Sequence, residues 1–123
     1  MNTQLTDNEA LELKALITLS DEKLAKIENL EEVKKYLLNL KELDLCERDD
    51  ITTLPNSISK LTQLTRLDLI GCKNLTTLPE SLGKLTQLTA LDLSWCENLT
   101  TLPESIGKLT QLWRTFEEET GPD

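Results

Sequence analysis

The amino-acid sequence predicts an α/β solenoid, a short arc of stacked coils with a helical cap at its N-terminus. A unit of 24 residues recurs three times in register between residues 37 and 108. Within each unit, leucine alternates with aspartate at the period of two that separates the two faces of a strand. A proline then opens a short segment suited to a helical or 3₁₀ turn. We therefore expect a parallel β-sheet on the concave face and short helical or 3₁₀ segments on the convex face.

Composition supports one domain with a core built from leucine. A chain of 123 residues is long enough for a single core. Aromatic residues make up only 3% of the chain while hydrophobic residues make up 38%, so rings cannot supply the core. Three units are about the minimum at which stacked coils bury a shared apolar face. The sequence is therefore just long enough for the predicted arc.

Charge and patterning restrict the class of partner and the location. Thirteen basic and 22 acidic residues give a net charge of −9, which disfavours nucleic acid and anionic membrane surfaces as partners. The N-terminus lacks a basic region followed by an apolar run, and nowhere do about 18 apolar residues follow one another. The three cysteines are an odd number and stand at repeat positions, without the spacing of a disulfide framework, which fits a reducing compartment. We expect a cytoplasmic protein, either in its own cell or in the cytosol of a host cell to which it is delivered.

Residues 1–36 are predicted to form the N-terminal cap. Thr6 and Glu9 have the spacing of a capping box, and Ser20 with Asp21 is a second N-cap signal. Apolar residues then recur at helical spacing, namely Leu24, Ile27, Leu30, Val33 and Leu37. A degenerate repeat is the alternative, because six apolar residues also fall in the 24-residue register, with Asp21 breaking it: Leu13, Leu16, Leu19, Leu24, Ile27 and Leu30. The helical cap is the preferred interpretation.

Residues 37–112 carry the repeats, with units at 37–60, 61–84 and 85–108 and a partial unit at 109–112. In the second unit, Leu67 and Leu69 are expected to point inward, while Arg66, Asp68 and Ile70 point to the solvent. Residues 113–123 are predicted to form a C-terminal cap and an acidic tail. The inward leucines have no counterpart there, so we expect the strands to stop.

The repeated pattern is L-x-x-L-x-L-x-x-C-x-x-L-x-x-L-P-x-x-I-x-x-L, which resembles the leucine-rich repeat. It is carried by Leu64, Leu67, Leu69, Cys72, Leu75, Leu78 and Leu82, and again by Leu88, Leu91, Leu93, Cys96, Leu99, Leu102 and Ile106. The repeat sequence, C-x-NLTTLPESIGKLTQL, is similar to repeats of cytosolic plant disease-resistance receptors, Ras-pathway scaffold proteins and some bacterial effectors. The resemblance implies a curved solenoid that binds proteins, with parallel strands on its concave side.

Catalysis and cofactor binding are not expected. The chain has no histidine, which removes the usual general base and the commonest metal ligand. Cys72 and Cys96 stack in adjacent coils but offer only two of the four ligands that a structural zinc site needs. We interpret them as buried thiols that help to satisfy loop backbone groups. Arg48 takes the same place in the first unit, which suggests a more open turn there.

The second and third units differ at five positions only: Arg66 and Ala90, Ile70 and Ser94, Gly71 and Trp95, Lys73 and Glu97, Leu82 and Ile106. Three of these pairs lie on the exposed side of the strand or at its exit, and a fourth lies in the turn just beyond. Variation on one face of a rigid scaffold is how binding surfaces are made. Recent duplication with few changes is the alternative explanation.

These observations predict a non-catalytic protein-interaction module that binds a protein partner through the concave strand face and the strand exits. The predicted partner-binding residues are Glu42, Asp44, Arg66, Asp68, Ile70, Asp92, Ser94, Trp95 and Trp113. The aspartate column favours a partner with a basic patch, although L-D-L is also common wording in such repeats. The alternatives are a structural module that self-associates weakly through its C-terminal edge strand, and the recognition segment of a larger receptor, effector or ligase.

Overall fold

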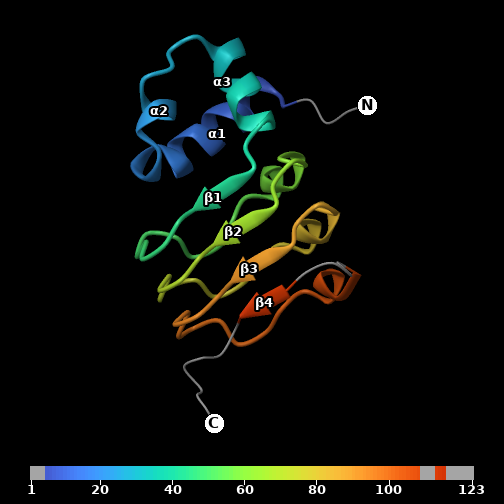
Figure 1. Ribbon diagram of the computed structural model, residues 1–123. Helices are drawn as coiled ribbons and strands as arrows, with labels where there is room; N and C mark the ends of the chain where they lie inside the picture. Colours follow the sequence, from blue (N-terminus) through green and yellow to red (C-terminus); the bar gives the residue numbers. More distant parts are fainter. Residues whose placement is uncertain (1–4, 109–112, 116–123) are drawn as a thin grey trace.

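A computed structural model describes residues 5–108 and 113–115 of the chain. Figure 1 shows a helical region followed by coils that stack one upon another. The helices are α1 (Asp7–Ile17), η1 (Thr18–Ser20), α2 (Glu22–Ala25), α3 (Leu30–Leu38), η2 (Asn56–Lys60), η3 (Glu80–Lys84) and η4 (Glu104–Lys108), where η marks a 3₁₀ helix. The strands are β1 (Glu42–Asp44), β2 (Arg66–Asp68), β3 (Ala90–Asp92) and β4 (Trp113–Thr115).

The four strands form one parallel sheet in the order β1-β2-β3-β4. Leu43 pairs with Leu67, and Leu67 with Leu91, so the pairing follows the 24-residue period of the sequence. The ladder continues past the strands, because the N–H of Leu45 donates to the carbonyl of Asp68 at 2.9 Å. This confirms the predicted solenoid with a parallel sheet.

The core consists of leucine side chains that point inward from the strands and turns. Leu67 and Leu69 of the second unit are fully buried, and Leu91 of the third is 1% exposed. Each leucine that leaves water in this way stabilises the fold by about 1.5–3 kcal/mol. Since each coil covers the apolar face of the coil before it, the stack forms one continuous core.

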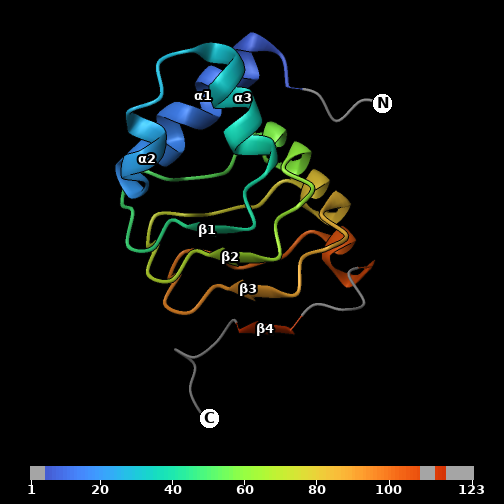
Figure 2. The same ribbon diagram turned by 45° about the horizontal axis from the view of Figure 1, so that its top comes forward.

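Short 3₁₀ helices lie across the core from the sheet, as predicted (Figure 2). Pro55 and Pro79 precede η2 and η3 with φ near −70°, which is the value that the proline ring fixes. The segments pack closely on each other. A Cβ atom built at Gly83 in η3 would lie 2.4 Å from the Cβ of Ser105 in η4, so only glycine fits at this contact.

The N-terminal cap is helical, which confirms the preferred interpretation over a degenerate repeat. Thr6 Oγ1 accepts from the N–H of Glu9 at 3.1 Å, and Glu9 accepts from the N–H of Thr6 at 3.0 Å, which completes the predicted capping box. Asp21 caps α2 by accepting from the N–H of Leu24 at 3.1 Å. Buried residues of α1 and α3 join the core, so the cap covers the open end of the first coil.

The side chains at the three equivalent turn positions 48, 72 and 96 each donate a hydrogen bond to the segment that precedes their coil in the stack. The thiols of Cys72 and Cys96 are buried and donate to the carbonyls of Leu45 and Leu69, each at 3.0 Å. This confirms their interpretation as thiols that satisfy loop backbone. The prediction of a more open turn at Arg48 is wrong, because its side chain is only 10% exposed. Its guanidinium group reaches the cap instead of the solvent.

The prediction that the strands stop after residue 112 is also wrong. β4 pairs with β3, with Ala90 opposite Trp113 and Leu91 opposite Arg114. This register is one residue short of the 24-residue spacing that relates the other strands. Strand pairing uses backbone groups, so an inward leucine is not required for a strand to add at the edge. The predicted acidic tail lies outside the described residues.

Candidate protein-binding face

The sheet register gathers the predicted strand residues on the concave face. Glu42, Arg66 and Ala90 stand opposite one another in successive strands, and so do Asp44, Asp68 and Asp92. The buried leucines between these two rows point into the core, so both rows face outward. The structure therefore places five of the predicted residues in two adjacent rows of one surface.

Arg66 lies within the acidic rows and forms a local ion pair. Its Nε donates to Asp68 Oδ2 at 3.1 Å, and this contact raises the pKa of the Arg66 guanidinium. The arginine is 49% exposed, so the pair adds little to stability. The second oxygen of Asp68, Oδ1, is buried and has no hydrogen-bond partner among the described residues.

Asp44 and Asp92 also have a structural role at the ends of their strands. The N–H of Cys46 donates to Asp44 Oδ1 at 3.0 Å. In the third unit both the N–H and the hydroxyl of Ser94 donate to Asp92 Oδ1, at 3.1 and 2.7 Å. Such contacts from an aspartate to a residue two positions later stabilise a turn. The aspartate column therefore shapes the strand exits in addition to charging the face.

Asp44, Cys46 and Asp68 bring three potential metal-ligand atoms within 4.8 Å of one another. Burial, followed by the nearby Asp44, raises the pKa of the Cys46 thiol to about 12. A thiol with this pKa stays protonated at neutral pH and is a weak nucleophile and ligand. The group also falls short of the four ligands of a closed structural zinc site. We assign no metal site to it.

A column of left-handed residues lies where the strands exit. Glu47, Gly71 and Trp95 occupy equivalent positions in the three units and have φ values of 60°, 75° and 64°. The backbone N–H of Glu47 donates to the backbone carbonyl of Ile70 at 2.7 Å, and the backbone N–H of Gly71 donates to the backbone carbonyl of Ser94 at 2.8 Å. These bonds join one coil to the next at this turn. The turn thus requires a conformation that glycine adopts freely.

Trp95 is the largest of the three residues in this left-handed column, where glutamate and glycine stand in the two coils before it. A left-handed conformation costs an L-residue roughly 1–2 kcal/mol, and glycine serves the equivalent place one coil earlier. Trp95 remains 57% exposed, so much of its surface stays available to a partner. Strained residues that the local fold does not require are characteristic of functional sites.

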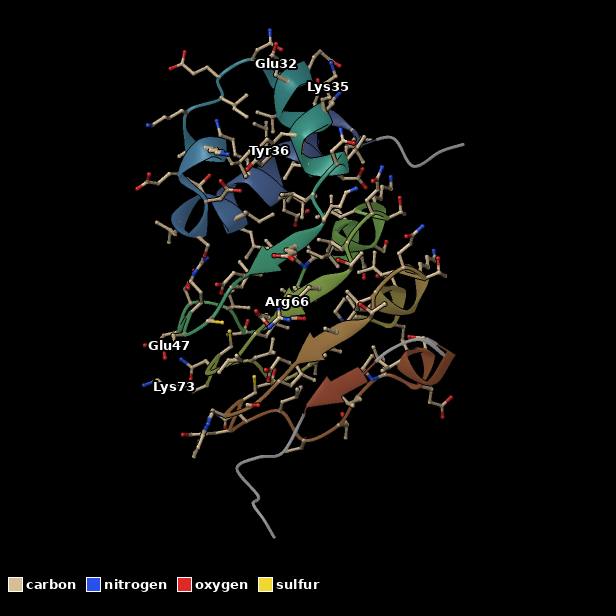
Figure 3. All side chains as sticks on the ribbon, in the orientation of Figure 1. Glu32, Lys35, Tyr36, Glu47, Arg66 and Lys73 are labelled. Carbon is tan, nitrogen blue, oxygen red and sulfur yellow. The ribbon has the colours of Figure 1, made fainter. Side chains whose placement is uncertain are left out.

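An open hollow of about 360 Å³ lies beside this column, and we call it the strand-exit hollow. It is lined by Glu47, Asp49, Gly71, Lys73, Trp95 and Glu97, with two residues from each of three coils. Figure 3 shows Glu47 and Lys73 on adjacent exit turns at one end of the strands. Lys73 Nζ lies 4.0 Å from Asp49 Oδ2. The lining thus holds three carboxylates, one ammonium group and one exposed indole.

The hollow includes five residues that the sequence prediction did not place in the site: Glu47, Asp49, Gly71, Lys73 and Glu97. The available signal was the substitution of Lys73 by Glu97 between two nearly identical units. Ile70 and Ser94 are half-buried at the base of the exits. The backbone of Trp113 pairs with Ala90 at the edge of the sheet, while its side chain is outside the described part of the structure.

Stacked coils with a parallel sheet on one side and 3₁₀ helices on the other define a solenoid repeat protein. The model of the leucine-rich repeat region matches residues 9–116, and the chain belongs to the leucine-rich repeat family. Domains of this family are generally non-catalytic modules that bind other proteins. Within the described residues, no helix has the length and apolar character that a membrane crossing needs.

One solved structure similar to this chain is the leucine-rich repeat domain of the type III effector XopL, at 31% sequence identity and a TM-score of 0.48. The match covers 63% of this chain and 34% of that one, so the chain spans about a third of the length of that relative. No curated protein matches the chain.

Proposed function

We propose that this chain is a non-catalytic interaction module that binds a protein partner through its concave strand face and the strand-exit hollow. The observation that carries the proposal is the position of Trp95, a 57% exposed indole held in a left-handed conformation at the edge of that hollow. Tryptophan is one of the residue types that are enriched among the few residues that contribute most of the binding energy at protein interfaces.

The differences between the second and third units support the same face. Arg66 and Ala90 pair in the sheet, whereas Gly71 and Trp95, and Lys73 and Glu97, all line the strand-exit hollow. The 3₁₀ side repeats without change at Thr76, Thr77, Glu80, Ser81 and Lys84. Side chains that vary on one face while the opposite face stays constant are typical of a scaffold that carries a binding surface.

The size of the surface also indicates that a partner contacts both the concave strand face and the strand-exit hollow. Strands about 4.8 Å apart give a narrow patch, whereas a standard interface buries about 800 Å² on each partner. The strand-exit hollow extends the concave face along the turns of three coils. The same surface would serve an isolated module or the recognition segment of a larger receptor, effector or ligase. The three free cysteines favour a cytoplasmic location in its own or a host cell.

Affinity capture with quantitative mass spectrometry tests the proposal, followed by calorimetry on purified partners. Trp95→Ala and Ile70→Asp alter the proposed face, and Thr77→Asp is the matched control on the unchanged convex side. We expect Trp95→Ala to weaken binding of a purified partner by about 1–3 kcal/mol. Circular dichroism must first show that each variant is folded. Equal binding by all three folded variants would remove the proposal.

Self-association is a second candidate function, and β4 favours it. β4 is the last strand of the described sheet and pairs with β3 on one side. An edge strand presents backbone groups that a strand of a second copy can pair with. Light scattering across a range of concentrations tests this candidate. A constant monomer mass at high concentration would exclude it.

A further inference from the structure

Building on the proposed function, we propose that the strand-exit hollow is a subsite for one arginine side chain of the partner protein. The guanidinium group lies against the indole of Trp95, and the carboxylates of Glu47 and Glu97 flank it. The shape of the hollow, its charge and the exposed ring each support this assignment.

Gly71 opens the space that the arginine would occupy. It lies between Glu47 of the coil before and Trp95 of the coil after, at the same turn position. A Cβ atom at Gly71 would already lie 3.0 Å from Cγ of Glu47. Any larger side chain at this position would fill the gap. The glycine therefore keeps a depression between a carboxylate and an indole, with its backbone as the floor.

The charge of the lining selects a cation. Three carboxylates face one ammonium group, and Lys73 is paired with Asp49 at 4.0 Å. Glu47 and Glu97 take part in no ion pair within the described residues. Both are exposed, so the desolvation cost of pairing them with a partner cation is small. The net charge of −9 attracts such a partner from a distance.

The ring of Trp95 favours arginine over lysine. Tryptophan is the aromatic residue that attracts cations most strongly through its face. A planar guanidinium can stack on the indole and donate to carboxylates in its plane at the same time. A lysine ammonium is a compact, strongly hydrated point charge that cannot stack. The hollow offers one ring and two carboxylates that have no ion-pair partner in the part of the chain that the structure describes, which suits the larger, flat cation.

Nuclear magnetic resonance titration with short peptides tests the assignment. The probe is acetyl-Gly-Arg-Gly-amide, and the matched peptides contain citrulline, which has the same shape without the charge, or lysine. The indole Nε1–H resonance of Trp95, assigned by its loss in Trp95→Gly, reports on the site. Glu97→Lys places in the third coil the residue type found at position 73 of the second. Glu28→Lys, on an exposed residue between α2 and α3 in the cap, changes the net charge by the same amount.

We expect the arginine peptide to shift the Trp95 indole and the backbone amides of the hollow, and to bind more tightly than the lysine and citrulline peptides. Relative to Glu28→Lys, both Trp95→Gly and Glu97→Lys should weaken binding by about two- to fivefold. Equal binding of the citrulline peptide would overturn the assignment, and so would lysine binding as tight as arginine. Equal effects of Glu97→Lys and Glu28→Lys would show attraction by net charge alone. Concentration-dependent shifts without peptide would show that a second copy of the chain occupies the hollow.

The two proposals fail separately. If purified partners lose affinity for Ile70→Asp but bind Trp95→Gly and Glu97→Lys normally, the arginine subsite is wrong and the interaction face stands. If none of these variants changes partner affinity, the interaction face is wrong as well.

Discussion

Arg48 Nη1 donates a 2.9 Å hydrogen bond to the backbone carbonyl of Leu16, which lies 32 positions earlier in the helical cap. The same guanidinium group binds Asp50 through two further bonds of 2.9 Å. Cysteine takes this place in the later coils and donates to the coil before it. Arg48 makes the equivalent hydrogen bond with a longer side chain, because the helical cap lies where a preceding coil would be.

Replacement of Arg48 by alanine is expected to lower the free energy of unfolding by about 2–3 kcal/mol, because the Leu16 carbonyl loses a charged donor in a part-buried place. Hydrogen exchange should show the largest loss of protection in α1 and η1. Arg66→Ala is the control, since that arginine is half exposed and should cost less than about 1 kcal/mol. Equal losses in both variants would contradict a role for Arg48 in holding the cap.

Gly83→Ala is expected to destabilise the stack by about 1–3 kcal/mol, since the added methyl group would overlap Ser105 of the next coil. Gly107→Ala is the matched control one coil later, where a Cβ meets no described atom within 4 Å. Urea unfolding of both variants measures the difference. A Gly83→Ala protein as stable as Gly107→Ala would show that η3 and η4 are less closely packed than the structure indicates.

Trp95→Gly is expected to leave the free energy of unfolding unchanged or to raise it by up to about 1 kcal/mol. Relief of the left-handed strain outweighs the greater freedom that glycine gives the unfolded chain. Urea unfolding checks this. A loss of more than about 1 kcal/mol would mean that the indole packs on the fold and would weaken its assignment to binding. A stable protein that binds its partner less tightly would show that tryptophan serves function at the expense of stability.

The phenol of Tyr36 is expected to titrate near pH 12. Burial, followed by its 2.8 Å hydrogen bond to Asp21, raises its pKa from the ordinary 10.0 to about 12. Between these values the unfolded chain loses the proton and the folded chain keeps it. Stability should therefore be fully present below pH 10 and fall as the pH rises toward 12.

Absorbance of the tyrosinate measures this pKa directly, because the chain has a single tyrosine. Tyr36→Phe should show no such transition, and its stability should fall less between pH 10 and pH 12. A midpoint near 10 in the folded wild type would contradict the hydrogen bond between the cap helices.

The leucine pattern was sufficient to predict the fold. The side chains of Leu67 and Leu69 alternate with polar neighbours, and this local pattern determines which residues of a strand are buried. The capping box at Thr6 and Glu9 is likewise local, and the structure confirms it. Signals of this kind need no knowledge of distant contacts. The rows of outward residues on the strands then follow from the repeat period.

The remaining features depend on contacts between distant segments. Burial of Arg48 depends on Leu16, whose place in the cap no repeat period predicts. The register of β4 differs by one residue from that of the other strands, which side-chain patterns alone do not reveal. The strand-exit hollow exists because three turns align, so Glu47 and Asp49, which lie two coils before Trp95, line the same hollow as Trp95 only in the folded stack. Gly71 was the one local sign that this turn is left-handed.

The thiol-to-carbonyl hydrogen bonds of Cys72 and Cys96 allow the transient separation of neighbouring coils to be measured at two places. Cys72 is closed in by Leu45 of the first coil, and Cys96 by Leu69 of the second. A reagent can reach either sulfur only when the neighbouring coils separate, so labelling rates at the two cysteines compare how often each junction opens. The first junction lies next to the helical cap and the second lies farther along the stack. The ratio of the two rates would show whether the solenoid frays from one end or opens in the middle.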